Sequence, residues 1–165
     1  MADNRTQTVT IDVISDVMCP WCFIGKRRLE RAAAMVEGAF SLAVAWHPFQ
    51  LDASLPPEGL DRRAYLEAKF GGAEQARKAY DQIAEVGRGE GIAFDLDAIM
   101  VSPNTLDAHR VIRWAGQDGP ATQDAVVEAL FVRFFTRAEH IGRHAVLADA
   151  AEAAGMDGAA VRAML

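Results

Sequence analysis

The sequence predicts an α/β protein that begins with a strand, a helix and a second strand and then continues as helices. Three observations carry this prediction. β-Branched residues alternate with polar ones near the N-terminus, apolar residues recur at helical spacing after residue 61, and a Cys-x-x-Cys sequence follows the first strand. The chain has 165 residues, of which 51% are hydrophobic, so it can bury a sizeable core and is not disordered as a whole.

The first three elements form the predicted βαβ unit. Residues 8–14 (TVTIDVI) alternate as a strand does, residues 22–36 are helical, and residues 40–46 (FSLAVAW) form a second strand that His47 and Pro48 end. A crossover helix of this length implies that the two strands are parallel. The helix face expected to point toward the core consists of Cys22, Gly25, Leu29, Ala32, Ala33 and Val36.

Helices alone are expected after Asp61, which can cap the first of them. That helix should end at Gly71, and Pro120 should lie in the first turn of a later one. The remaining helices are expected at about 74–86, after Asn104, at about 145–154 and at 158–165. The strongest apolar stripe, and so the expected centre of the helical core, is Val126, Val127, Leu130, Phe131, Phe134 and Phe135. We therefore divide the chain into a βαβ part, residues 1–60, and a helical insertion domain, residues 61–165.

The cysteine pair, Cys19 and Cys22, is the most informative feature. A thiol at a helix start lies near free backbone N–H groups and the positive end of the helix dipole, and both lower its pKa. Pro20 suits the first helical position. We expect Cys19 to be the exposed, ionised nucleophile and Cys22 to be the shielded residue that resolves a mixed disulfide. Lys26 and Arg27 could add positive potential, although solvated helix charges are the more ordinary interpretation.

Two other interpretations of the pair stay open. A zinc site would need four ligands, and only the distant His140 and His144 could complete one. The cysteines could also be two incidental core residues. Redox chemistry is favoured over both, because Cys-x-x-Cys beside a βαβ pattern is typical of it.

Three further residues are weaker candidates. His47 follows the second strand, at the edge where open α/β sheets place their sites. His109 could contact Thr105 one turn back, and a packing role is favoured for it. Trp21, between the cysteines, could form part of a surface that binds a partner, or simply shield a disulfide.

The net charge and the N-terminal sequence narrow the expected partners and the expected cellular compartment of the protein. The net charge is 17 − 23 = −6, which argues against nucleic acid as a partner. No apolar run approaches the roughly 20 residues that span a bilayer, so no membrane association is expected. The first residues lack the pattern of a secretory signal, and two cysteines are too few for a disulfide-stapled secreted scaffold. A cytoplasmic location is therefore expected.

With these residues in view, the chain resembles the DsbA-like thioredoxin-fold oxidoreductase family, in its FrnE-like branch. The similarity covers nearly the whole chain. Its most specific part is the segment from Asp12 to Glu30 around Cys-Pro-Trp-Cys. The other similar segments are Trp46–Asp52, Asn104–Arg110 and Glu128–Phe135.

The resemblance implies a thioredoxin-like βαβ unit with an all-helical insertion. It implies thiol–disulfide exchange by Cys19 and Cys22. From the helix start and the residues between the cysteines, we expect a pKa of Cys19 between about 3.5 and about 7. No cofactor beyond the cysteine pair is expected, and glutathione is one candidate co-substrate. The expected partners are proteins or small molecules that carry thiols or disulfides, and a homodimer is left open.

The resemblance also predicts one missing part of the fold and two competing functions. The C-terminal ββα part of a thioredoxin fold, with its cis-proline, is expected to be missing, because no proline precedes a strand-like run in the last third. Related 2-hydroxychromene-2-carboxylate isomerases and kappa-class glutathione transferases generally have Ser at the position of Cys19. A glutathione-dependent enzyme of that kind is the alternative function, and a non-enzymatic redox-sensing module is the second.

Overall fold

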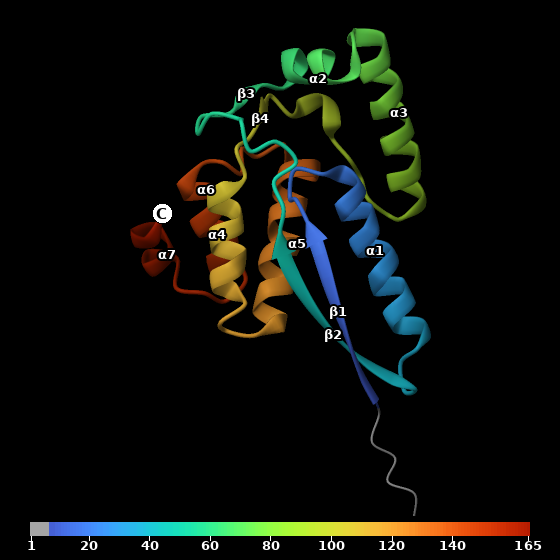
Figure 1. The fold of residues 1–165 in the computed structure, drawn as a ribbon, viewed down its shortest axis with the longest axis vertical. Helices are drawn as coiled ribbons and strands as arrows, with labels where there is room; N and C mark the ends of the chain where they lie inside the picture. The colour runs from blue at the N-terminus through green and yellow to red at the C-terminus, as the bar shows by residue number, and fades with distance from the viewer. Residues whose placement is uncertain (1–6) are drawn as a thin grey trace, which may run out of the picture.

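The computed structural model describes residues 7–165, which fold as a short parallel sheet flanked by helices (Figure 1). The predicted βαβ unit is confirmed: it consists of β1 (Gln7–Ser15), α1 (Pro20–Met35) and β2 (Phe40–Pro48). β1 and β2 are parallel, and their register runs from Gln7 opposite Phe40 to Ser15 opposite Pro48. His47 and Pro48 belong to β2, so the strand ends slightly later than predicted.

The rest of the described chain is mainly helical, as predicted. Its elements are β3 (Leu60–Asp61), α2 (Arg62–Phe70), α3 (Ala73–Gly89), the short 3₁₀ helix η1 (Leu96–Ala98), β4 (Val101–Ser102), α4 (Leu106–Ala115), α5 (Pro120–Arg137), α6 (His144–Ala153) and α7 (Gly158–Met164). Asp61 caps α2, since its carboxylate accepts a hydrogen bond of 2.9 Å from the N–H of Ala64. Gly71 ends that helix at φ 81°, a left-handed conformation that favours glycine.

The prediction that no strand follows Asp61 is wrong in one detail. β3 and β4 form an antiparallel pair of two residues each, joining segments 40 residues apart in the chain. Strands this short carry no alternating pattern, so sequence periodicity could not reveal them.

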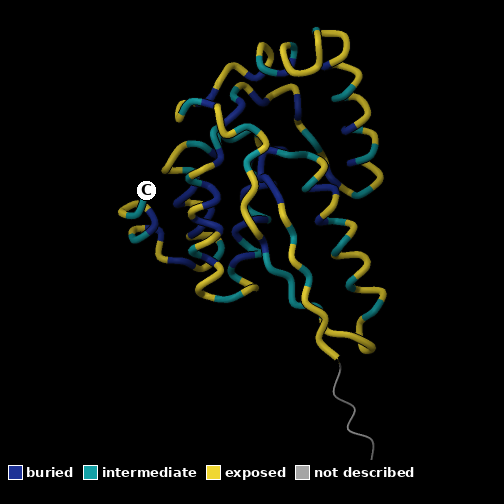
Figure 2. The backbone as a smooth tube through the Cα atoms, in the orientation of Figure 1, coloured by how far each residue is buried: buried dark blue, intermediate teal, exposed yellow. Residues whose placement is uncertain are grey.

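The core-facing side of α1 also differs from the prediction. The buried residues of α1 are Phe23, Ile24 and Lys26, whereas Gly25 and Ala32 are exposed. α1 is anchored through its first turns, where the ring of Phe23 stacks on Phe131 of α5 with centroids 5.0 Å apart. Most of the rest of α1 faces solvent (Figure 2), but Cys22, Leu29, Ala33 and Val36 of the predicted face are half-buried. Apolar periodicity therefore gave the buried side of this helix in part.

The predicted stripe of α5 is confirmed as the centre of the core. All six of its residues are at most 1% exposed. One continuous apolar cluster joins them to Val17 and Trp46 of the βαβ unit. The division of the chain at residue 60 stays a prediction. No helix among the described residues is long and apolar enough to cross a bilayer.

Candidate functional site

The Cys-x-x-Cys sequence lies at the junction of strand and helix, as predicted. β1 ends at Ser15 and α1 begins at Pro20, with Cys19 as its N-cap residue in extended conformation. Its carbonyl oxygen accepts a hydrogen bond of 3.1 Å from the N–H of Cys22. Both thiols are free, and the two cysteines approach to 3.5 Å. The turn thus brings two reactive sulfurs together at one helix end.

The two cysteines do not differ in exposure as expected. Cys19 and Cys22 are both half-buried, so neither is fully exposed and neither is fully shielded. The loop after β2 lies against the β1–α1 loop that precedes the pair, since its Leu51 N–H is bonded to the Asp16 carboxylate at 2.7 Å. Any difference in their chemical roles must come from hydrogen bonding and charge.

The thiols titrate as a pair because their side chains are hydrogen-bonded to each other. This bond lowers the pKa of Cys22 to about 6, against the opposing effect of burial. The same bond, followed by burial, raises the pKa of Cys19, although the backbone N–H groups of Cys22 and Trp21 lower it. The expectation of a lowered pKa at Cys19 is therefore wrong while Cys19 holds the proton that the two thiols share. The helix start acts in the expected direction, but the bond between the thiols outweighs it.

Three buried polar residues lie in or against the loop between β1 and α1: Ser15, Asp16 and His109. The Oδ1 atom of Asp16 accepts a bond of 3.3 Å from the Met18 N–H and lies 3.3 Å from Nε2 of His109. The backbone N–H of Asp16 and the Ser15 hydroxyl lower the pKa of Cys22, while the Asp16 carboxylate raises it. Cys22 therefore packs against the apolar core and also has polar neighbours in Ser15 and Asp16.

Sequence reasoning missed Ser15 and Asp16 as site residues and placed His109 elsewhere. The backbone N–H of His109 does bond to Thr105 one turn back, but its imidazole reaches Asp16, 93 residues away. A serine and an acid between an apolar strand and apolar Val17 were a usable signal for Ser15 and Asp16, because polar groups there must be buried. No local signal could have paired His109 with Asp16.

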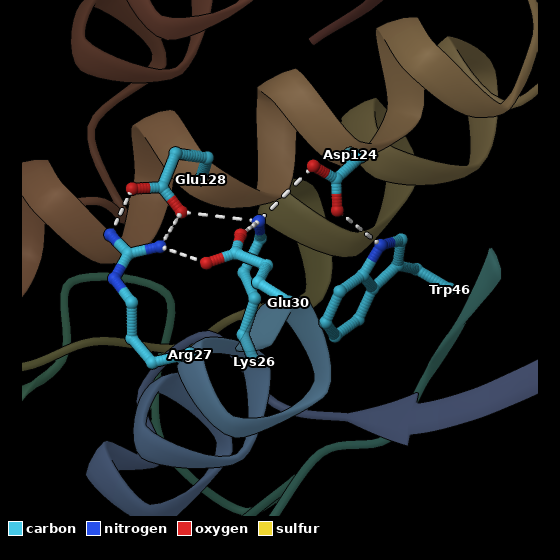
Figure 3. A network of polar contacts seen from close by, with 6 residues as sticks. All are labelled: Lys26, Arg27, Glu30, Trp46, Asp124 and Glu128. Carbon is cyan, nitrogen blue, oxygen red and sulfur yellow. Dashed lines mark hydrogen bonds and ion pairs between the residues drawn. The ribbon is translucent and has the colours of Figure 1, made fainter. Parts of the chain in front are cut away.

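Lys26 and Arg27 do not act on the thiols. Figure 3 shows that their charged groups turn toward carboxylates of α1 and α5. Lys26 Nζ pairs with Glu30, with Asp124 at 3.1 Å and with Glu128 at 3.3 Å, and Arg27 pairs with Glu30 and Glu128. Neither residue is among the main causes of the pKa shift of Cys19. Lys26 is only 3% exposed, so the solvated interpretation is wrong for it as well.

In this network, which we call the Lys26 cluster (Lys26, Arg27, Glu30, Asp124 and Glu128), every charged group has an oppositely charged partner. Burial lowers the pKa of Lys26, but the hydrogen bond to Glu30 and the charges of Asp124 and Glu128 outweigh it and raise the pKa. Asp124 also accepts a hydrogen bond of 3.0 Å from the Trp46 indole. The cluster therefore joins α1, β2 and α5 as a structural element.

The remaining candidates lie around the site or away from it. The His47 imidazole is half-exposed and pairs with Asp12 at 2.7 Å, with no contact to either cysteine. Trp21 is 45% exposed, as a role in binding a partner requires.

The two histidines of the zinc interpretation are engaged elsewhere. His140 bonds to the N–H of Gly142 at 3.1 Å, and His144 pairs with Asp107 at 3.0 Å. Within residues 7–165, no three His, Cys, Asp or Glu side chains are grouped as a metal site requires.

Comparison with known proteins agrees with this geometry. Residues 10–165 match the family model of the DSBA-like thioredoxin domain. A crystal structure of a probable DsbA oxidoreductase from Streptomyces coelicolor superposes with a TM-score of 0.82 at 27% identity, over 93% of this chain and 66% of that one. The uncharacterized protein YwbO of Bacillus subtilis is 28% identical over 161 residues, which are 96% of this chain and 72% of YwbO. The chain spans about two thirds of the solved relative, and it belongs to the DSBA-like thioredoxin domain family.

Proposed function

We propose that the protein is a thiol–disulfide oxidoreductase that uses Cys19 and Cys22 as its dithiol/disulfide pair. One observation carries the proposal. Two free thiols, 3.5 Å apart, lie at a helix start in a chain of this family, and their hydrogen bond lowers the pKa of one of them to about 6. Near neutral pH, the reduced pair then holds one thiolate, which is the reactive form in exchange.

Cys19 is the proposed nucleophile and Cys22 the resolving residue. The thiol hydrogen bond lets Cys19 pass its proton to Cys22 and so acquire the charge, which the helix N–H groups then stabilise. Cys19 attacks one sulfur of a substrate disulfide, that disulfide breaks, and its other sulfur leaves as a thiolate. Cys22 then attacks Cys19 and releases the second substrate thiol. The protein ends oxidised, and an external thiol such as glutathione must reduce it before the next turnover.

The surface around the pair supports a protein or peptide substrate. Trp21, Phe49 and Leu51 are 45%, 51% and 43% exposed. Phe49 and Leu51 are held beside the pair, since their N–H groups bond to the Ser15 carbonyl at 3.1 Å and to Asp16. Exposed apolar side chains that flank a reactive group are suited to docking. A small disulfide such as oxidised glutathione remains the second substrate class, and the proposed compartment is the cytoplasm.

The test is the reduction of insulin by dithiothreitol with catalytic amounts of protein. The wild type should accelerate it, and Cys19→Ser should abolish the acceleration. Cys22→Ser should instead accumulate a mixed disulfide with the substrate, visible by mass spectrometry, because resolution is blocked. Acceleration that survives in Cys19→Ser would contradict the proposal.

Two parallel assays separate the other functions. A glutathione-dependent isomerase would turn over 2-hydroxychromene-2-carboxylate while leaving insulin intact. A redox sensor would bind a partner in only one oxidation state, without turnover in either assay. Either pattern would replace the proposed activity.

A further inference from the structure

In the resolving step, Cys22 must lose a proton while its side chain is half-buried, so a nearby group has to accept that proton. In the reduced resting pair, the proton stays on Cys19. Once Cys19 is bound in a mixed disulfide, Cys22 holds the remaining proton and must give it up before attacking. The groups around Cys22 therefore decide how fast this step can be.

Two buried polar atoms near the β1–α1 junction have no hydrogen-bond partner. Among the described residues, Ser15 Oγ and His109 Nδ1 are the only buried side-chain nitrogen or oxygen atoms without a hydrogen-bond partner. Leaving such an atom unpaired costs about 1–3 kcal/mol. The two residues are 6% and 5% exposed. Two unpaired atoms in one place therefore require an explanation.

The same two residues line one small cavity of about 10 Å³. A space of about 10–15 Å³ holds a single water molecule if two or more polar groups can bind it. Apart from Ser15, His47 and His109, the residues lining the cavity are Val17, Trp46, Ile112 and Val127. The cavity therefore fits one water bridging Ser15 Oγ to His109 Nδ1, which would satisfy both atoms.

The titratable groups near this cavity come from four elements. His109 of α4 and His47 of β2 line it, Asp16 of the β1–α1 loop contacts His109, and Cys22 of α1 lies next to Ser15. The imidazole of His47 is paired with Asp12. α5 contributes only Val127. His109 is therefore the titratable group with a free nitrogen at the cavity.

We propose, resting on the function proposed above, that His109 accepts the proton of Cys22 through Ser15 and one buried water. The Asp16 carboxylate beside Nε2 favours the tautomer that carries its proton there, which leaves Nδ1 as the acceptor. A positive His109 would then be compensated by Asp16 at 3.3 Å. Asp16 acts as a positioning residue in this arrangement.

The step is balanced as follows. Cys22 forms a bond to the sulfur of Cys19, and the bond between Cys19 and the substrate sulfur breaks. The electron pair leaves with the substrate sulfur as a thiolate. The proton of Cys22 passes to Ser15, Ser15 gives its own proton to the water, and the water gives one to Nδ1 of His109. Solvent later removes it.

The experiment follows both thiols in one reaction. The reduced protein is mixed with one equivalent of dithiobis(nitrobenzoate), an aromatic disulfide that releases a coloured thiolate. The first release reports attack by Cys19, and the second reports ring closure by Cys22. His109→Gln should slow the second release by about tenfold or more near neutral pH and leave the first within about twofold. The defect should shrink at alkaline pH, where hydroxide can accept the proton, which a purely structural role would not produce.

Two further variants complete the design. His144→Gln, which removes an exposed histidine paired with Asp107, is the matched control and should behave as the wild type. Ser15→Ala should reproduce the selective loss. It is also the decisive variant if His109→Gln fails to fold, because it removes a single oxygen atom from a small side chain.

The outcomes separate this inference from the proposed function. If the wild type gives no second release, the pair does not close and the proposed function itself fails. If the wild type gives both releases, and Ser15→Ala and any folded His109→Gln match it at every pH, only the relay is overturned. If the first release slows as much as the second, His109 supports the fold of the site rather than the proton transfer, and the relay is likewise overturned.

Discussion

Helix α1 takes part in two polar clusters that differ in whether every polar group has a partner. In the Lys26 cluster, Lys26 and Arg27 face three carboxylates, and each charge has an opposite partner (Figure 3). At the start of the same helix, two thiols hold less than two protons near neutral pH, and Ser15 and His109 each leave one buried atom unpaired. A polar cluster in which every group has a partner is typical of a structural role. Unpaired buried atoms near a thiol with a lowered pKa are typical of a reactive site. The contrast assigns stability to one cluster and reactivity to the other.

The largest stability effect should come from the apolar core that both clusters adjoin. Phe131 is fully buried and stacks on Phe23, which follows Cys22 directly. Phe131→Ala should cost about 3–5 kcal/mol of unfolding free energy, because it removes transfer energy and leaves a cavity. Denaturant unfolding of the reduced protein measures this. A cost below about 1 kcal/mol would mean that this face is not tightly packed.

Lys26→Met tests the Lys26 cluster most directly. The side chain keeps most of its volume, but three carboxylates lose their buried cation. Those carboxylates are 31–45% exposed, so solvent moderates the loss to about 1–3 kcal/mol. Insulin reduction should stay within about twofold of the wild type, because Lys26 does not act on Cys19. A large fall in activity with stability unchanged would reverse the assignment of the two clusters.

A smaller effect is expected from acid. The partly buried Glu128 has a lowered pKa, because burial, which raises it, is outweighed by the hydrogen bond from Arg27 and by the charge of Lys26. A carboxylate of this kind contributes stability above its unfolded pKa, about 4.3, and the contribution is lost as pH falls through the folded pKa. Glu128→Gln should therefore flatten the loss of thermal stability below about pH 4.3.

The control for that measurement is Glu74→Gln. Glu74 is 75% exposed and pairs only with Lys78, one turn along α3. Its acid profile should match the wild type, since exposed pairs contribute little. Equal flattening in both variants would show that acid unfolding reflects overall charge and not the Lys26 cluster.

The sequence predicted the elements well because their signals are local. Alternation gave β1 and β2, the spacing of apolar residues gave α5, and capping by Asp61 with Gly71 gave the bounds of α2. The cysteine pair was also found from a local motif. The buried side of α1 was found only in part, because Phe23 is buried against the ring of Phe131, more than a hundred residues away.

The surroundings of the thiols could not be predicted from local sequence patterns. Asp16 and His109 are 93 residues apart and meet only in the fold. Lys26 looks like an ordinary surface lysine in sequence, and only the approach of Asp124 and Glu128 from α5 makes its burial tolerable. The direction of the Cys19 pKa depends on the partner thiol at 3.5 Å, a distance that no residue spacing specifies.

The most direct test is the ultraviolet thiolate absorbance of the reduced protein followed against pH. The account predicts one thiolate per chain with a midpoint of about 6, and a second thiol that stays protonated well beyond the ordinary value of about 8.5. Cys22→Ser should leave Cys19 titrating alone and below about 8.5, because the N–H groups at the helix start still stabilise its thiolate. Two thiols that titrate together near about 8.5 would contradict the shared proton and the chemistry built on it.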